Sequence, residues 1–549
     1  MTIDTLPDLV AQWVEQAPEK TWLRDLDEKG SLDYSWRQAH TQISAIGAML
    51  EQRFGHGEKM VLLSRNRAHW VMADLAIIAS GNVTVSMFTT LPASTAEYIL
   101  QLTQARVIFV GETSNWEQVV PVLPDDVVVV TLPGVEVEQP HEKWEDLLSQ
   151  YSGQSRTYQC QPDDMISLVF TSGTTGMPKG VIQTHNSNLI PIRRFTDIFG
   201  FAENPRYFSY LPLSHIAERQ IVEFSSIVLG GEIYFNEALD KLARDLPRTR
   251  PHVFFGPPRV WEQLQQAVIE KFGGKDAFAA ALAEDRAGIG QLVLEGLGFS
   301  DVEYCLTAAA PTPPALIHWW QDLGLTLMEG FGQTEAMGLI LSSREQRRIG
   351  SIGKPIGEVE YKITEEGELA IKAAGCTPGY YKQEDKTAEL IRDGWLHTGD
   401  KARVDEDGFL YITGRVKDYF KTIQGKFVAP PPIESAFAEN LHAEQQCLLG
   451  RGFSKTVMVA VLTAEAQKAP DSEIEDSIRS TIVEINGQIE HHARIGAVIL
   501  SREPWSIENE VLTPTLKIRR EKVEERFGEL AEALARESAE QRELLLHWH

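Results

Sequence analysis

The chain contains 549 residues, of which 43% are hydrophobic and 24% are charged, and its formal net charge is −26. This length predicts more than one domain, because single hydrophobic cores rarely grow beyond ~250–300 residues. The acidic balance argues against nucleic acid as a partner, since neutralising phosphates needs a basic surface. The four cysteines are widely spaced, which favours reduced thiols in a cytoplasmic protein over a disulfide framework or a zinc site.

Two features argue against secretion and membrane insertion. Residues 1–8 lack the basic start and apolar core of a signal peptide. The most apolar long stretch, residues 71–85, contains Asp74, Gly81 and Asn82, which favours a buried helix followed by a strand. We therefore expect no transmembrane segment, while a peripheral membrane contact stays compatible with the sequence.

Helices and strands alternate in the first part of the chain. Short apolar runs predict strands at 61–63, 83–87, 106–110, 127–131 and 165–170. Longer apolar segments predict helices at 69–79 and 94–103. This alternation is typical of parallel sheets that are covered by helices on both faces. Residues 133–160, with their Gly and Pro interruptions and scattered charges, are interpreted as a surface connection.

A loop of small hydroxyls and glycines follows the strand predicted at 165–170. It reads Thr-Ser-Gly-Thr-Thr-Gly from Thr171 to Gly176, and Pro178 and Lys179 come next. Glycines let successive N–H groups point at one anion, hydroxyls add donors, and lysine adds positive charge. The pattern favours phosphate binding over the alternative of a flexible surface loop. It is not a Walker A loop, which needs Gly-x-x-x-x-Gly-Lys-Ser/Thr.

Three later strands run into segments that carry candidate chemistry. His215 comes just beyond a strand and before an apolar helix at 221–229. Taken alone, the histidine favours a cap of the next helix. A strand at 303–307 ends in three alanines, 308–310, whose small side chains would let a flat ring approach the backbone. A strand from residue 325 is predicted to enter a glycine-flanked loop with a phenylalanine, a threonine and a glutamate, at Phe331, Thr334 and Glu335. These side chains suit base stacking, phosphate binding and Mg²⁺ coordination respectively, although a helix-capping turn would also explain the last two.

The following part of the chain is β-rich. Residues 366–371 alternate as a strand does, and the pairs Asp393-Gly394 and Asp407-Gly408 predict hairpins. Asp400 comes between the two pairs, and a carboxylate on a rigid turn is suited to accept both hydroxyls of a ribose. The alternative is a β-meander with a surface aspartate.

Beyond Glu434 the sequence predicts a compact α+β domain, with a strand at 457–462 and a helix at 472–491. A segment rich in threonine and proline then contains Lys517, which by itself would be taken for an ordinary surface lysine. The closing helix has one apolar face, made by Val523, Phe527, Leu530 and Leu534.

Six of these segments, in order from Thr171 to Lys517, resemble the motifs of the adenylate-forming (ANL) superfamily of acyl-CoA synthetases, peptide-synthetase adenylation domains and beetle luciferases. The Leu-Pro-Leu-x-His-Ile-x-Glu-Arg form around His215 and the Gln-Gly-x-aromatic-Val-Ala-Pro form around Gly425 are most similar to long-chain fatty acyl-CoA synthetases. The resemblance implies an α/β fold: a large N-terminal domain of parallel-type sheets with a small β-subdomain, and a mobile α+β C-terminal lid. We expect the large domain at 1–414, a hinge at 415–418 that rotates about Lys417, and the lid at 419–549.

The resemblance also implies a reaction that uses ATP, Mg²⁺ and coenzyme A. A medium- or long-chain fatty acid would be converted to acyl-AMP and then to its CoA thioester. Catalytic roles are implied for His215, Thr334, Glu335 and Lys517, and metal contacts for Thr171 and Glu335. Contacts with the nucleotide and CoA are implied for Thr171, Ser172, Gly173, Thr174, Thr175, Gly176, Lys179, Ala309, Ala310, Glu329, Gly330, Phe331, Gly332, Thr334, Asp400, Ile412, Arg415, Lys417 and Gly425.

Other readings of the same motifs stay open. The acyl group could pass to a carrier protein, or the adenylate could become another product such as a β-lactone. In a different class, the chain would be a non-catalytic regulator that binds a nucleotide or an acyl-adenylate. Retention of both Glu335 and Lys517 argues against the regulator. Small-molecule substrates are the expected partners, and the chain suits a monomer or a homodimer.

Overall fold

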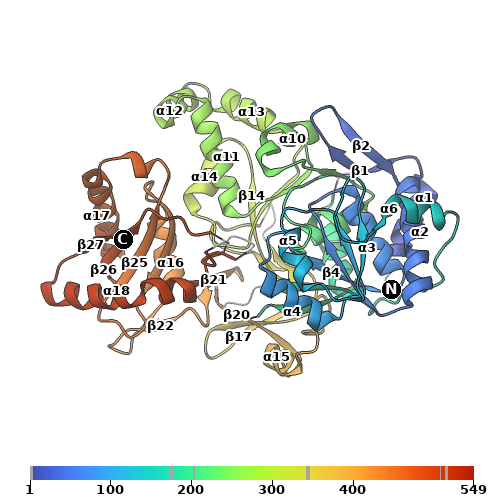
Figure 1. Ribbon diagram of the computed structural model, residues 1–549. Coiled ribbons are helices and arrows are strands. Elements are labelled where there is room, and N and C mark those ends of the chain that lie inside the picture. The colour runs from blue at the N-terminus through green and yellow to red at the C-terminus, as the bar shows by residue number, and fades with distance from the viewer. Residues whose placement is uncertain (1–3, 172–176, 202–203, 342–345, 507–508, 514–516) are drawn as a thin grey trace.

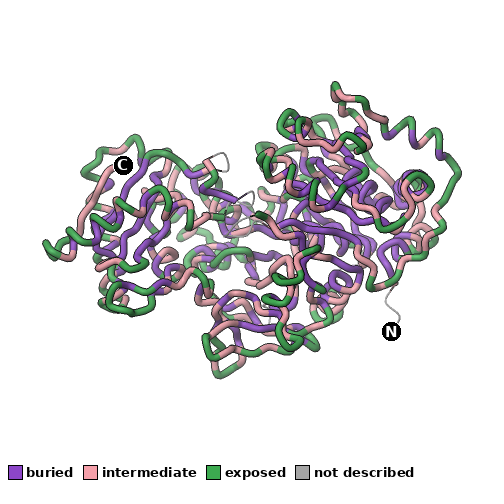
Figure 2. Tube along the Cα trace, turned by 60° about the horizontal axis from the view of Figure 1, so that its bottom comes forward, coloured by how far each residue is buried: buried purple, intermediate pink, exposed green. Residues whose placement is uncertain are grey.

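A computed structural model describes residues 4–171, 177–201, 204–341, 346–506, 509–513 and 517–549. The fold is α/β, as the sequence predicts, with a large N-terminal domain and a smaller C-terminal domain beside it (Figure 1). Buried segments lie in the interior of both domains (Figure 2). Of the helices in the described segments, none is both long and apolar enough to cross a membrane.

A seven-stranded sheet contains the strands predicted in the first part of the chain. It is parallel except at one edge, where β8 and β9 form an antiparallel pair. The parallel strands are short and apolar because helices cover both faces of such a sheet. In spatial order the strands are β7 (Glu142–Lys143), β6 (Val128–Thr131), β5 (Val107–Val110), β3 (Lys59–Leu63), β4 (Val83–Met87), β8 (Met165–Thr171) and β9 (Lys179–Thr184).

A nine-stranded sheet forms the second layer of strands in the large domain. Its central strands are parallel, and antiparallel partners close it at both edges. In spatial order the strands are β16 (Lys354–Pro355), β15 (Ala336–Leu341), β14 (Leu327–Gln333), β13 (Tyr304–Thr307), β12 (Val253–Phe255), β10 (Arg206–Ser209), β11 (Glu232–Phe235), β1 (Thr21–Leu26) and β2 (Ser31–Ser35).

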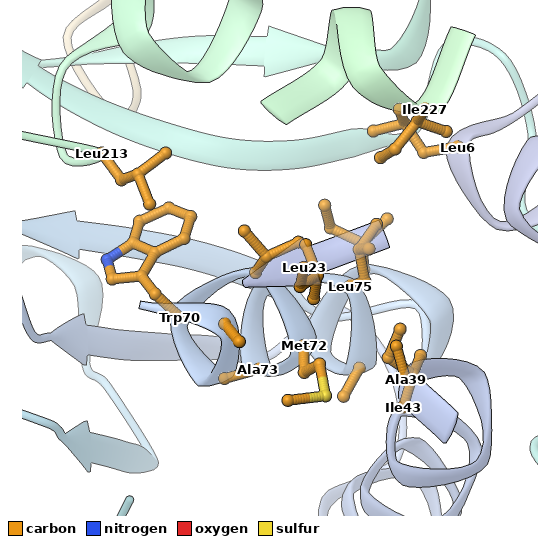
Figure 3. Close-up of a cluster of buried hydrophobic side chains, with 14 of the residues drawn as sticks. Leu6, Leu23, Ala39, Ile43, Trp70, Met72, Ala73, Leu75, Leu213 and Ile227 are labelled. Atoms are coloured by element: carbon orange, nitrogen blue, oxygen red, sulfur yellow. The ribbon is translucent and has the colours of Figure 1, made fainter. Parts of the chain in front are cut away.

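Helix α3 (Ala68–Ala79) is buried on all sides and contacts strands of both sheets. A helix that is apolar all round belongs in a core rather than on a surface. Figure 3 shows its side chains Trp70 and Leu75 in one cluster with Leu23 of β1 and Leu213. Helices α1 (Leu6–Gln16) and α2 (Trp36–Phe54) also contribute side chains to this cluster. The predicted helix at 69–79 is confirmed, and so is the one at 94–103, which is α4 (Ala93–Thr103).

The segment 133–160 is not only a surface connection. It contains β7 and a short helix, α6 (Trp144–Gln150), whose Trp144 is fully buried. The indole Nε1 of Trp144 donates to Gln42 Oε1 at 2.9 Å, which satisfies its polar group inside the core. The apolar residues of α6 lie one turn apart, but the surrounding Gly, Pro and charged residues obscured that spacing.

Five helices, α10 to α14, cover the outer face of the nine-stranded sheet around a second core that contains Trp261 and Trp320. Helices α12 and α13 are largely exposed, apart from Phe278, Gly290 and Val293. The helices are α10 (Leu242–Thr249), α11 (Pro258–Lys271), α12 (Lys275–Glu284), α13 (Arg286–Leu297) and α14 (Pro314–Asp322).

A small β-subdomain follows, and both predicted hairpins are present. Asp393 and Gly394 have φ angles of +52° and +77° at the turn between β19 and β20, the left-handed pair that a two-residue hairpin favours. The Asp407-Gly408 pair lies in the turn between β20 and β21. The elements are β17 (Glu360–Ile363), β18 (Glu368–Lys372), α15 (Glu384–Leu390), β19 (Ile391–Arg392), β20 (Trp395–Val404) and β21 (Leu410–Arg415).

The C-terminal domain is a four-stranded sheet with helices on both faces, preceded by a hairpin of β22 (Phe420–Lys421) and β23 (Phe427–Val428). Alternate residues of β25 enter different cores: Met458 packs toward α17, and Val457 packs toward α18. The predicted strand at 457–462 is therefore confirmed, and the predicted helix ends at Gln488. The remaining elements are α16 (Pro430–Phe437), β24 (Ala443–Leu449), β25 (Thr456–Leu462), α17 (Asp471–Gln488), β26 (Ile495–Ser501), α18 (Arg520–Gln541) and β27 (Leu545–Trp548).

Candidate active site

A cavity of about 970 Å³ lies where the two large sheets, the β-subdomain and the C-terminal domain meet. Most sequence-predicted residues that the structure describes line it, although they come from segments hundreds of residues apart. Parallel strands bring their carboxyl ends to one edge of a sheet, which is where such residues gather. The predicted residues that line the cavity are Thr171, Lys179, His215, Ala309, Gly330, Phe331, Gly332, Thr334, Glu335, Arg415, Lys417 and Lys517.

The residues that flank the predicted phosphate loop belong to an antiparallel pair of strands. Thr171 ends β8 and lies opposite Lys179, the first residue of β9. The loop residues Ser172–Gly176 lie outside the described residues. The ammonium of Lys179 lies 4.6 Å from the centre of the Tyr380 ring. Burial lowers the pKa of Lys179, while the Glu335 carboxylate opposes that shift.

Thr334 and Glu335 form the turn between β14 and β15. The predicted glycine-flanked loop before them is instead strand, because residues 327–333 pair with β15 and β13. Gln183 Nε2 donates to the Thr334 carbonyl at 2.8 Å, which ties the turn to β9. The Tyr380 hydroxyl donates to Glu335 Oε1 at 2.7 Å. Burial and the Glu335 charge raise the pKa of Tyr380, so this hydroxyl stays protonated and orients the carboxylate.

Asp400 is buried beside the cavity, in β20. Arg415 Nε lies 2.8 Å from its Oδ1, and Gln333 Nε2 donates to its Oδ2 at 2.5 Å. Burial raises the pKa of Asp400, and Arg415 and Gln333 oppose that rise. Gln333 also donates to the Thr398 carbonyl at 2.8 Å, so one amide joins β14 to β20. The sequence reasoning missed Gln333 and Tyr380 because glutamine and tyrosine carry no motif signal apart from their place in the fold.

His215 begins α8 (Ile216–Glu218), where its Nδ1 accepts a hydrogen bond from the Ala217 N–H at 3.1 Å. The Nε2 atom is therefore the protonated nitrogen of the neutral ring. Burial, followed by the positive charge of Lys517, lowers the pKa of His215 to about 4. The imidazole is thus neutral at pH 7 and offers a hydrogen-bond donor inside the cavity.

Lys517 comes from the C-terminal domain and completes the polar part of the cavity. Its backbone N–H donates to Thr513 Oγ1 at 3.0 Å, and the Thr513 N–H donates to the Lys517 carbonyl at 2.8 Å. Lys517 is exposed as a whole residue, and it also lines the cavity. Desolvation of its ammonium among the cavity residues, followed by the positive charge of Arg415, lowers the pKa of Lys517, while Asp400 and Glu335 oppose the shift.

Apolar residues of α7 (His185–Phe199) and of strands β12 and β13 also line the cavity, and we call this part of the lining the apolar arm. A π-helical turn, Arg219–Phe224, and α9 (Ser225–Leu229) form its remaining wall, so the predicted helix at 221–229 is present in modified form. The apolar lining residues alternate along strands and recur once per helical turn, a pattern that the sequence does not separate from ordinary core. They include Ile192, Phe195, Ile221, Leu229, Val253, Phe255 and Leu306.

Besides Asp400, four of the described predicted residues lie outside the cavity lining. Ala310 is exposed next to it, and Ile412 packs against the core of the β-subdomain. Glu329 accepts a hydrogen bond from the Gly350 N–H at 2.8 Å, and burial raises its pKa to about 7. Gly425, with φ of +73°, lies in the exposed turn of the β22–β23 hairpin.

Comparison with known protein families shows what the chain is similar to. The family described as AMP-binding enzyme matches residues 10–381, more than half of the chain. The chain belongs to the AMP-binding enzyme family. The AMP-binding enzyme C-terminal domain matches residues 417–538.

Named relatives in this family align with nearly the whole chain. Fatty acyl-CoA synthetase A of Dictyostelium discoideum is 27% identical and covers 91% of this chain and 86% of its own length. The long-chain-fatty-acid–CoA ligase FadD15 of Mycobacterium bovis is 28% identical, covering 91% of this chain and 92% of its own.

Solved structures of other proteins share the fold. The anthranilate CoA ligase AuaEII in complex with anthranoyl-AMP superposes with a TM-score of 0.79 at 23% identity, covering 97% of this chain and 98% of its own. The adenylation domain of a carboxylate reductase from Mycobacterium chelonae superposes with a TM-score of 0.81 at 21% identity. The match covers 97% of this chain and 91% of that domain.

Proposed function

We propose that the protein is an AMP-forming fatty acyl-CoA synthetase. It condenses a fatty acid with ATP to acyl-AMP and pyrophosphate, and coenzyme A then displaces AMP to give the thioester. The observation that carries this proposal is the cavity itself, in which an apolar arm opens into a polar part that holds Lys179, His215 and Lys517. The names of the aligned relatives support the same chemistry.

In the first step a carboxylate oxygen attacks the α-phosphorus of ATP, and pyrophosphate leaves. This displacement needs positioning and charge stabilisation more than covalent help from the protein. Lys517 stabilises the negative charge on the carboxylate and α-phosphate, and the Nε2–H of His215 orients the acid. Thr171, Thr334, Lys179 and the loop residues Ser172–Gly176 bind the phosphates, so the leaving pyrophosphate is neutralised at the loop.

Glu335 and Thr171 fit a Mg²⁺ ion that accompanies ATP. Both present oxygen atoms at the cavity, the kind of ligand that this cation prefers. Tyr380 fixes one Glu335 oxygen by its hydrogen bond. When bound, the ion supplies positive charge to the phosphate oxygens.

The nucleoside end of the polar part is built for AMP. Phe331 and Ala309 line the cavity and provide an aromatic face and a small residue for the adenine. Asp400, held by Gln333 and assisted by Arg415, accepts the ribose hydroxyls. Ala310, Glu329, Gly330, Gly332 and Ile412 then support this pocket through the backbone and packing of their strands rather than through side-chain contact.

Two orientations of the C-terminal domain serve the two steps. The described arrangement places Lys517 in the cavity and the Gly425 turn outside it, which suits adenylation. We place the large domain at 1–414, the hinge at 415–418 and the lid at 419–549, with rotation about Lys417 bringing Gly425 toward the pantetheine of CoA. The free thiols of all four cysteines fit a cytoplasmic location.

The apolar arm favours a medium- or long-chain acid. Each methylene moved from water into such an arm contributes ~0.8 kcal/mol, so several methylenes dominate selectivity over acetate. The test is AMP release across straight-chain acids from acetate to stearate, with and without CoA. We expect a CoA-dependent optimum at medium or long chains. AMP release without a need for CoA, or an optimum at acetate, would contradict the proposal.

A further inference from the structure

An ion pair joins the large domain to the C-terminal domain. Arg259 Nη2 contacts Glu444 Oε1, and 185 residues separate them in sequence. Arg259 is the second residue of α11, which lies on the side of the large domain that faces the C-terminal domain (Figure 1). Glu444 is the second residue of β24.

This ion pair differs from the contacts close to the hinge. There, the Tyr419 hydroxyl donates to the Thr413 carbonyl at 3.1 Å, and Lys401 lies 4.4 Å from the Tyr419 ring centre. Those contacts involve residues next to the rotating bonds and can persist when the domain turns. Arg259 and Glu444 belong to the bodies of the two domains, so a rotation about residues 415–418 must separate them.

The pair is suited to open and close. The two side chains are 47% and 32% exposed, so water can solvate both charges after separation. Arg259 also has a second carboxylate within electrostatic reach. Glu262 lies one turn further along α11, and the positive charge of Arg259 opposes the rise in its pKa that burial causes. Residues three apart on a helix are neighbours, so Glu262 can receive the guanidinium when Glu444 leaves.

We propose that Arg259 is a positioning residue, which holds the C-terminal domain in the adenylation orientation through Glu444 and turns to Glu262 when the domain rotates. This inference rests on the proposed two-step function. Arg259 affects adenylation through Lys517, because Lys517 stays in the cavity while the C-terminal domain keeps the adenylation orientation. An exposed ion pair shifts an equilibrium by about two- to five-fold, which is enough to bias the orientation without locking it.

The half-reactions measured separately test this role. We expect Arg259→Gln and Glu444→Gln each to lower acid-dependent ATP–pyrophosphate exchange about two- to five-fold. Thioester formation from synthetic acyl-AMP and CoA should stay constant or rise. The double variant should lower the exchange rate no further than either single variant, because each single substitution already removes the same ion pair. Arg286→Gln is the matched control, since it breaks an exposed pair with Asp322 (3.0 Å) inside the large domain.

Interdomain distance gives a readout that does not depend on catalysis. Spin labels at two exposed positions, Lys275 of α12 and Glu484 of α17, report the orientation of the C-terminal domain by double electron–electron resonance. In Arg259→Gln a second distance population should grow, and in Arg286→Gln it should not. An unchanged distribution, an equal fall of both half-reactions, or additive effects in the double variant would each overturn the inference. If the unmodified enzyme shows neither half-reaction but the interdomain distance distribution still shifts in Arg259→Gln, the proposed function is rejected and the role of the ion pair is not.

Discussion

Replacing Lys517 by alanine separates the two half-reactions of the proposed mechanism. The ammonium enters the cavity from the C-terminal domain and has Arg415, Asp400 and Glu335 as charged neighbours. An ammonium ~4 Å from a developing negative oxygen contributes roughly 4 kcal/mol at an effective dielectric constant of about 20. Loss of one preorganised donor in characterised enzymes costs about 3–4 kcal/mol. Both values predict a fall of adenylation by roughly 100- to 1,000-fold.

The assay compares ATP–pyrophosphate exchange with thioester formation from synthetic acyl-AMP and CoA. Lys517→Ala should abolish most exchange and leave the second reaction largely intact, because that step uses the other domain orientation. Lys522→Ala is the control in the same domain: Lys522 pairs with Glu525 at 2.8 Å on α18 and lies outside the cavity lining. Equal loss of both half-reactions by Lys517→Ala, with unchanged thermal unfolding, would refute the assignment.

Two further predictions concern buried polar groups. Asp400→Asn should raise KM for ATP roughly 10- to 100-fold, since hydrogen bonds to a charged group contribute about 1.5–3 kcal/mol. The control, Asp407→Asn at the exposed hairpin turn, should leave KM for ATP unchanged. Equal KM values for the two variants would contradict the ribose role of Asp400. His185 is fully buried, its Nδ1 accepts from the Leu6 N–H at 3.2 Å, and burial lowers its pKa to about 4. Between about pH 6.5 and 4 the histidine is protonated in the unfolded chain but not in the folded chain. The free energy of unfolding is therefore unaffected above about pH 6.5 and falls toward pH 4, by up to about 3 kcal/mol. Urea unfolding across this range should show a shallower pH dependence in His185→Gln, and an unchanged slope would exclude the histidine as its source.

Much of the local structure follows from the sequence alone. Met165–Phe170 is a strand because it is a short apolar run that ends at glycines and hydroxyls, and it forms β8 almost residue for residue. Asp393-Gly394 forms a hairpin because its two residues tolerate positive φ. The α18 face that contains Val523 and Phe527 packs against the sheet because its apolar residues recur with the helical period.

The sequence also selects the chemistry of the candidate site, because ordered motifs identify residue types together with their spacing. From Thr171 to Lys517, most of the described candidates line one cavity. Their spacing gives no distances between them, however. Lys517 reaches the cavity, and the Gly425 turn lies outside it. This difference depends on the orientation of one domain relative to the other.

Only the tertiary structure decides which neutral or distant side chains hold the site together. Gln333 fixes Asp400, Tyr380 fixes Glu335, and Arg259 meets Glu444. Trp144 is core rather than surface for the same reason: Gln42, from another helix, satisfies its indole. Local patterns record the preferences of neighbouring residues, whereas these contacts join segments tens to hundreds of residues apart, and chain folding alone brings them within hydrogen-bonding distance.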